Sequence, residues 1–416
     1  MYQKDFIYSI LLFLLSPAIA LFAAFKNSMS ASSYNVIWFF SGFMGLTFAG
    51  YGSDYTSDLT RYLEEFNLWK IEDRGLSYLI NNSYVEYGYQ DIFFPFISLI
   101  SAKIGLPDIA FLGLIGLIFG FFYSRVYKIL VSDIQFNKDF FLIVLIITFL
   151  LIIPIWRGIN GIRFSLGAII FVYLILRSYN TGFNFKTVLL ISSLFLIHFS
   201  MALPIFAFLL FLTIKKVLNT SHLFFLYIIS FFFTSINLDI LNESLKNYVP
   251  LFLYRKVDAY ARESIFDEII EETSNTNWYA LVFTKALFYA ISIMVVYIYI
   301  KYKDLKDYNV RFDYLIKFTF LFTIIVNLLN FIPSLGRMAL ISNTLVMYIF
   351  IFLISNLKNN SFHLFHLKFL LFPLLLLYIT VQMRIGFDFM SVETIIGNPM
   401  ITLFNIEKIP LIDLIK

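Results

Sequence analysis

Five arginines are the residues of this chain best suited to bind an anion. They stand beside long apolar runs or in the loops between them: Arg157, Arg163, Arg255, Arg337 and Arg384. An arginine close to the hydrocarbon of a membrane is costly, and it tends to face a wet or protein-lined interior. Several guanidinium groups on one side predict a pocket for a doubly anionic group, and diphosphate fits the planar, bidentate fork of arginine.

Arg157 and Arg163 are the strongest candidates for this role. A turn containing Gly158 and Gly161 separates them, and glycine lets the backbone approach a ligand closely. The helix predicted after Gly161 begins on the same side, and a helix N-terminus beside an arginine favours an anion. The alternative is that both side chains reach toward lipid headgroup phosphates.

Arg337 and Arg255 are two further candidates for binding the anion. Arg337 follows Gly336 and begins a later apolar helix, as Arg163 does. Arg255 lies in a long hydrophilic loop, where it either contacts the substrate or pairs with Asp258 or Glu263 at the surface.

Two aspartates supply candidate carboxylates for proton transfer. Asp54 and Asp58 are spaced to share one helix face, and Arg61 follows Asp58 at a spacing that allows a local ion pair. A carboxylate here would position or deprotonate a hydroxyl group. The alternative is a solvated helix start with Ser53 or Asp54 as its cap.

Glu86 and His198 complete the candidates for proton transfer. Glu86 is flanked by Tyr84, Tyr87 and Tyr89, an arrangement that suits carbohydrate stacking and equally suits an interfacial aromatic belt. His198 interrupts an apolar run, where it either transfers a proton or makes a hydrogen bond between helices. No second histidine or carboxylate accompanies it at metal-ligand spacing, so the sequence predicts no metal. Without a phosphate-binding or dinucleotide motif, it predicts no other cofactor.

The composition is that of an integral membrane protein. Hydrophobic residues make up 60% of the 416 residues and charged residues 14%, whereas a soluble domain carries roughly a quarter charged residues. Long unbroken apolar runs favour helices over the alternating pattern of a barrel. There is no cysteine, which excludes disulfides and thiol chemistry.

The apolar runs predict an all-α bundle of about twelve transmembrane spans, forming one domain over residues 1–416. The run 92–105 is short and contains Pro95, so we expect a re-entrant or interfacial helix. The pair 186–197 and 200–214 either crosses twice or forms one tilted helix broken near Pro204. The expected spans are 6–25, 34–50, 108–125, 139–156, 160–177, 186–197, 200–214, 222–237, 279–300, 313–333, 338–356 and 367–383.

Loop charges predict the orientation, because cytoplasmic loops carry the excess of Lys and Arg. The alternation requires that 92–105 does not cross and that 186–214 crosses twice. It leaves both termini and two long hydrophilic loops, 51–91 and 238–278, on the outer side with the five arginines. The cations assigned to the cytoplasm are Lys26, Arg125, Lys128, Lys138, Arg177, Lys186, Lys215, Lys216, Lys301, Lys303, Lys306, Arg311, Lys358 and Lys368.

Several segments resemble the EpsG/Wzy-type polysaccharide polymerases, in order and over most of the chain. GSDYTSDLTRYLEEF resembles the G-T-D-Y start of that family, and Glu86 with Gly88 and Tyr89 resembles its E-x-G-Y element. NGIRFSLGAIIF resembles its I-R-Q-x-x-A helix, and LFLIHFSMAL resembles its F-H-x-S-A-L segment. Arg337 resembles an arginine ahead of a late helix. Phe164 stands where glutamine is common in the family, and Met201 is inserted in the histidine segment.

The resemblance implies a bacterial inner-membrane polymerase of O-antigen or capsule, a glycosyltransferase of lipopolysaccharide and polysaccharide biosynthesis. It would join undecaprenyl-diphosphate-linked oligosaccharides at the periplasmic face without a cofactor. Arginines would hold the diphosphate, and a carboxylate or His198 would take the hydroxyl proton. The implied partners are this lipid-linked oligosaccharide, membrane lipid and a chain-length regulator protein, with no nucleic acid. The alternatives are a polysaccharide flippase or transporter, and a glycosyltransferase or ligase that uses lipid-linked sugars.

Overall fold

The described part of the chain is helical almost throughout. The computed structural model describes residues 2–26, 31–49, 58–71, 75–80, 91–134, 139–232, 278–303, 310–330, 335–356, 361–402 and 408–414. Within these ranges the β contacts are two isolated bridges, Phe48 with Met390 and Ser391 with Pro410.

Six helical stretches are long and apolar enough to cross a membrane. Six further apolar stretches, counted over the residues whose side chains are described, are shorter, whereas the sequence predicts about twelve spans. The six are Asp108–Asp133, Phe140–Asn160, Ile162–Tyr179, Phe312–Leu329, Gly336–Asn356 and Phe365–Gly386; the shorter ones are Pro17–Lys26, Phe93–Lys103, Phe185–Leu196, Phe199–Ile214, Thr220–Ser230 and Lys285–Ile300. The chain is therefore a helical membrane protein.

One of the predicted spans is interrupted in the structure. The expected helix 6–25 is divided into α1 (Tyr2–Leu15) and α2 (Pro17–Lys26), because Pro17 fits the start of a helix better than its interior. The expected segments 186–197 and 200–214 are separated at His198, between the 3-10 turns η2 (Ser193–Leu196) and η3 (Phe199–Met201), which is where the two ranges place the break. The alternative of a break near Pro204 is wrong, since Pro204 lies in the first turn of α12 (Ala202–Ile214).

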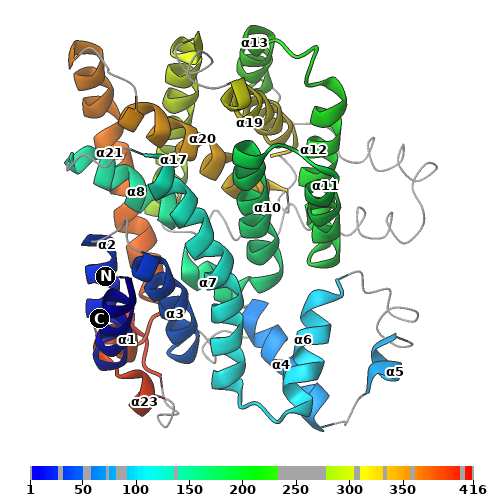
Figure 1. The fold of residues 1–416 in the computed structure, drawn as a ribbon, viewed down its shortest axis with the longest axis vertical. Coiled ribbons are helices and arrows are strands. Elements are labelled where there is room, and N and C mark those ends of the chain that lie inside the picture. The colour runs from blue at the N-terminus through cyan, green and yellow to red at the C-terminus, as the bar shows by residue number, and fades with distance from the viewer. Residues whose placement is uncertain are drawn as a thin grey trace. The chain divides into compact units, whose positions relative to one another are not determined.

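The chain forms two compact units, and the first comprises residues 1–201 and 379–416. Its remaining helices, seen in blue, cyan and green in Figure 1, are α3 (Ala31–Leu46), α4 (Asp58–Ile71), α5 (Leu76–Tyr78), α6 (Phe93–Lys103), α7 (Asp108–Asp133), α8 (Phe140–Ile152), α9 (Ile155–Asn160), α10 (Ile162–Thr181) and α11 (Phe185–Ser192). The last part of α21 (Ser361–Gly386), α22 (Val392–Ile396), α23 (Pro399–Thr402) and the 3-10 turn η5 (Leu411–Leu414) complete it.

Glycines bring α3 and α7 into backbone contact, and the two helices lie side by side in Figure 1. A Cβ atom on Gly45 would lie 2.2 Å from the carbonyl oxygen of Leu112, and one on Gly116 would lie 2.3 Å from that of Ser41. Small residues at a helix interface allow this approach in membranes, where dispersion contacts replace the hydrophobic effect between helices. Among the described helices of the first unit, α3 and α7 make the most extensive contact, and α9 and α10 also pack against α7.

The second unit spans Ala202–Tyr378. It contains α12, α13 (Thr220–Ser230), α17 (Trp278–Ile300), α19 (Val310–Leu329), the 3-10 turn η4 (Gly336–Met338), α20 (Ala339–Asn356) and most of α21. The side chains of α20 from Leu345 to Leu353 are buried, so this helix forms the centre of the unit. Asn327 of α19 donates a hydrogen bond of 3.0 Å to Ser230 of α13, the kind of polar contact that joins membrane helices.

Candidate functional site

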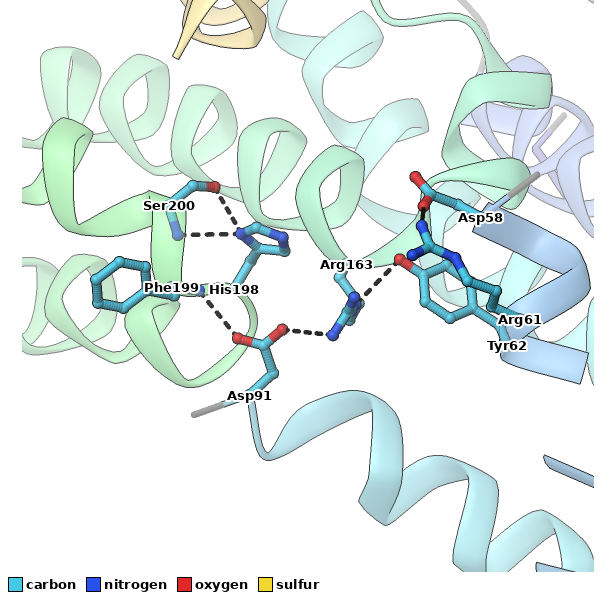
Figure 2. A network of polar contacts seen from close by, with 8 residues as sticks. All are labelled: Asp58, Arg61, Tyr62, Asp91, Arg163, His198, Phe199 and Ser200. Atoms are coloured by element: carbon cyan, nitrogen blue, oxygen red, sulfur yellow. Dashed lines mark hydrogen bonds and ion pairs between the residues drawn. The ribbon is translucent and has the colours of Figure 1, made fainter. Parts of the chain in front are cut away.

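Arg163 is the centre of a polar network that joins three separate segments of the first unit (Figure 2). It lies in the first turn of α10, and its side chain is 27% exposed. Its Nη1 donates to Oδ2 of Asp91 at 2.9 Å, and its Nε donates to the hydroxyl of Tyr62 at 3.0 Å. Nη2 makes no hydrogen bond to any residue that the structure describes. The guanidinium group is thus held on two sides and retains donors for an anion.

Asp91 is buried immediately before α6, and each of its oxygens accepts a hydrogen bond. Oδ2 accepts from Arg163, and Oδ1 accepts from the backbone N–H of Phe199 at 3.0 Å. The N–H of Ile92 donates to the carbonyl of Leu196 at 2.9 Å. A buried carboxylate needs such partners, because an isolated charge is very costly away from water. The start of α6 is therefore fixed to the segment that carries His198.

Tyr62 supplies the third side of the network. It is buried on α4, its ring lies 4.6 Å from that of Phe94, and the Arg163 guanidinium lies 5.0 Å from its ring centroid. Burial raises the pKa of Tyr62, and the nearby Arg163 offsets part of that rise. The hydroxyl therefore stays protonated at neutral pH and can donate its own proton while it accepts from Arg163.

The Nδ1 atom of His198 contacts Ser200. Its Nδ1 accepts from the backbone N–H of Ser200 at 3.0 Å and lies 2.6 Å from Oγ of Ser200. These contacts cap the turn η3, and Figure 2 shows the opposite edge of the ring on the side where Arg163 lies. Because Nδ1 is an acceptor, a neutral His198 carries its proton on Nε2. In that state the ring is a hydrogen-bond donor at Nε2.

Substitution of His198 tests its capping role. We expect His198→Asn to keep the thermal stability of the protein, because asparagine caps a helical turn well. We expect His198→Leu to lower that stability, because the N–H of Ser200 then loses a partner, at a cost of about 1–3 kcal/mol. The measurement is the melting temperature of each purified variant in detergent. Equal melting temperatures of the two variants would contradict the capping role.

Two residues that depart from the family pattern are accommodated beside the network. Phe164 packs edge-to-face on His198, with ring centroids 6.1 Å apart and planes at 84°. Met201 covers Gly167 of α10, where an added Cβ would lie 2.9 Å from the Met201 side chain. The aromatic ring and the thioether thus secure the histidine segment against α10.

Arg157 stands close to this network through the backbone. Its carbonyl accepts from Gly161 N–H at 2.9 Å and from the hydroxyl of Ser165 at 3.1 Å, which ties α9 to the first turn of α10. Gly161 caps α10 without a side-chain hydrogen bond. Partly exposed arginines beside an uncapped helix N-terminus form an arrangement that attracts anions.

The predicted roles of the two glycines differ in the structure. Gly158 is needed for close packing, since an added Cβ would lie 2.6 Å from the ring of Phe119 on α7. Gly161 is uncrowded, because its nearest neighbour would lie 3.5 Å from such an atom. The close approach thus serves the contact between α9 and α7.

The remaining candidates fall into three groups. Asp58 pairs with Arg61, which is the local ion pair that their spacing allows. Arg384 pairs with Asp388 at 2.9 Å. Arg337 is exposed in η4 of the second unit. Three candidates lie outside the described residues: Asp54, Glu86 and Arg255.

Sequence reasoning missed two members of the network. Asp91 received no role, although it is a carboxylate directly before an apolar helix and on the side assigned to Arg163. Tyr62 follows Arg61 directly, and its spacing from Arg163 carries no signal of a contact. Arg163 is therefore not an isolated cation, because Asp91 pairs with it.

The fold and this network define a helical membrane protein whose first unit carries a clamped arginine at the start of a helix. No match to this chain was found among protein-family models, curated proteins or solved structures. In the ranges that the structure describes, no three His, Cys, Asp or Glu side chains gather as a metal site requires.

Proposed function

We propose that this chain is an O-antigen or capsular polysaccharide polymerase. One observation carries the proposal: segments matching the family's elements, far apart in the sequence, meet around Arg163. Tyr62 comes from the G-S-D-Y segment, Arg163 from the I-R helix, and Phe199 from the F-H segment, while Asp91 follows the E-x-G-Y element. A resemblance by chance gives no reason for these segments to converge.

The proposed reaction is transfer of a glycosyl chain between two lipid-linked substrates. A hydroxyl at the non-reducing end of one repeat attacks the anomeric carbon of the growing chain. The new glycosidic bond forms, the bond from that carbon to the diphosphate oxygen breaks, and undecaprenyl diphosphate leaves with the electron pair. The hydroxyl proton passes to a base. No nucleotide is required, because the lipid diphosphate is already an activated donor.

The residues of the first unit divide this work. Arg163 and Arg157 stabilise the negative charge that develops on the leaving diphosphate, as fixed cations do when they are oriented before the reaction. Asp91 and Tyr62 hold the Arg163 fork in place. His198 donates from Nε2 to a substrate oxygen. The proton acceptor is then a carboxylate of the outer loops, with Glu86 and Asp54 as candidates, since Asp58 is engaged by Arg61.

The proposal includes an inner-membrane location, about twelve spans and a site that faces the periplasm. Single-cysteine labelling tests this orientation, because the chain has no native cysteine. We expect an impermeant reagent on intact cells to label Ser57→Cys and to leave Lys303→Cys unlabelled. The reverse pattern would overturn the orientation.

The polysaccharide ladder of a deletion strain tests the function. We expect long chains to disappear while one repeat remains on the lipid core, since assembly and transport of the single repeat continue. Loss of that single repeat as well would favour a flippase or a ligase. An unchanged ladder would overturn the proposal, and return of long chains on expression of the intact gene is the control.

A further inference from the structure

The segment that follows α21 packs against the start of α9. The ring of Phe389 stacks on that of Trp156, with centroids 4.9 Å apart and planes 5° apart. The Phe389 ring also lies 5.6 Å from that of Phe48, at the end of α3. A Cβ on Gly386 would lie 3.4 Å from the indole of Trp156. The C-terminal segment therefore places an aromatic ring between the ends of two helices.

Backbone and side-chain hydrogen bonds hold this segment in position. Ala49 N–H donates to the carbonyl of Phe389 at 3.0 Å, and Leu411 N–H donates to that of Met390 at 2.8 Å. The hydroxyls of Thr47 and Thr394 lie 2.7 Å apart in a buried contact. Because these bonds surround Phe389, its ring is fixed by the fold and is not a loosely attached side chain.

Trp156 also contacts Arg157. The guanidinium carbon of Arg157 lies 5.5 Å from the centroid of the Trp156 ring, within the range of a cation–π contact. The helix that carries both residues, α9, has only six residues. So short a helix has little stability of its own, and its placement depends on packing. Trp156 is buried and is the side chain of α9 that Phe389 contacts.

We propose that Phe389 is a positioning residue that sets the orientation of Arg157 through Trp156. The C-terminal segment is thereby a component of the diphosphate site and not only a cover for the N-terminal helices. This inference rests on the proposed function, because it takes diphosphate as the ligand of Arg157.

The test measures binding of inorganic diphosphate to the purified full chain through tryptophan fluorescence. Trp156 lies beside Arg157, so an anion bound there changes its emission, and Trp156→Phe assigns the signal. We expect Phe389→Leu to raise the diphosphate concentration for half of the response by about threefold to tenfold, the range of an aromatic pair. Phe389→Tyr keeps the ring and should restore the response. Ile396→Ala, an exposed residue of α22, is the matched control.

The outcomes separate positioning from simple instability and from the proposed function. Equal melting temperatures of the Phe389→Leu and Phe389→Tyr proteins, with different diphosphate midpoints, support positioning. If Phe389→Leu binds as the unaltered protein does while Arg157→Ala abolishes the response, the inference is overturned and the proposed function stands. A response that is absent, or that survives Arg157→Ala, overturns the inference as well. Normal long chains in Arg157→Ala cells would extend that failure to the proposed role of Arg157 in the reaction.

Discussion

Replacing Arg163 with alanine should abolish chain extension, whereas Arg177→Ala should leave it unchanged. Both arginines lie on α10, but Arg177 is exposed near its other end, where its guanidinium group donates a hydrogen bond to the hydroxyl of Tyr173. In the proposed reaction, this substitution removes a cation that stabilises the leaving diphosphate, and loss of one such donor costs about 100- to 1000-fold in rate. Arg163→Lys should recover only part of the activity, because lysine lacks the bidentate fork.

The ion pair with Asp91 determines how this experiment must be controlled. Arg163→Ala leaves a buried carboxylate without its cation, which destabilises a protein by about 3–5 kcal/mol. We therefore expect less of this variant in the membrane. The double variant Arg163→Ala/Asp91→Ala removes both charges and should recover the protein but not the activity. Long chains from the double variant would show that Arg163 serves structure alone.

Gly116→Ala should strongly reduce the amount of folded protein, although alanine usually favours helices. Its methyl group would meet the backbone carbonyl of Ser41, which cannot turn aside. Gly113→Ala, one turn away on α7, is the matched control, because its methyl group comes closest to the side chain of Leu46, while the carbonyl oxygen of Gly42 lies at an ordinary contact distance of 3.6 Å. Overpacking costs about 1–3 kcal/mol or more where the backbone must shift, and the gain in helix propensity is about 1 kcal/mol.

The measurement is the fraction of each variant that stays monodisperse in detergent after heating. We expect Gly113→Ala to resemble the unaltered protein and Gly116→Ala to aggregate at a clearly lower temperature. Equal behaviour of the two variants would mean that α3 and α7 do not touch at Gly116 in the membrane.

Local features of this chain could be predicted from the sequence, because they depend on neighbours in the chain. The helical class followed from unbroken apolar runs, and the ion pair of Asp58 and Arg61 followed from their spacing. The sequence singles out Arg163, because an arginine at the start of an apolar helix needs an explanation. The interruption at Pro17 was missed, since the apolar run continues through it and hydropathy alone does not register the break.

The partners of Arg163 could not be predicted in the same way. Asp91 precedes it by 72 residues and Tyr62 by 101, and no periodic pattern links positions so far apart. The sequence also does not show which ring nitrogen of a neutral His198 carries the proton. That depends on a hydrogen bond from Ser200 N–H, which forms only in the turn η3. A single sequence shows which groups need a partner, but the fold decides which partner each one obtains.

The order of Asp91 and Arg163 along the chain bears on how this protein is made. Domains and helices emerge from the ribosome from the N-terminus onward. Asp91 and α6 therefore reach the membrane before α10 is synthesised, and the carboxylate is already in place when Arg163 arrives. Inserting an arginine alone into hydrocarbon has a high free-energy cost. A counter-ion that is already inserted lowers this cost, because Arg163 then enters as part of a neutral pair. The ion pair that holds the site in the mature protein thus also favours insertion of α10 into the membrane during synthesis.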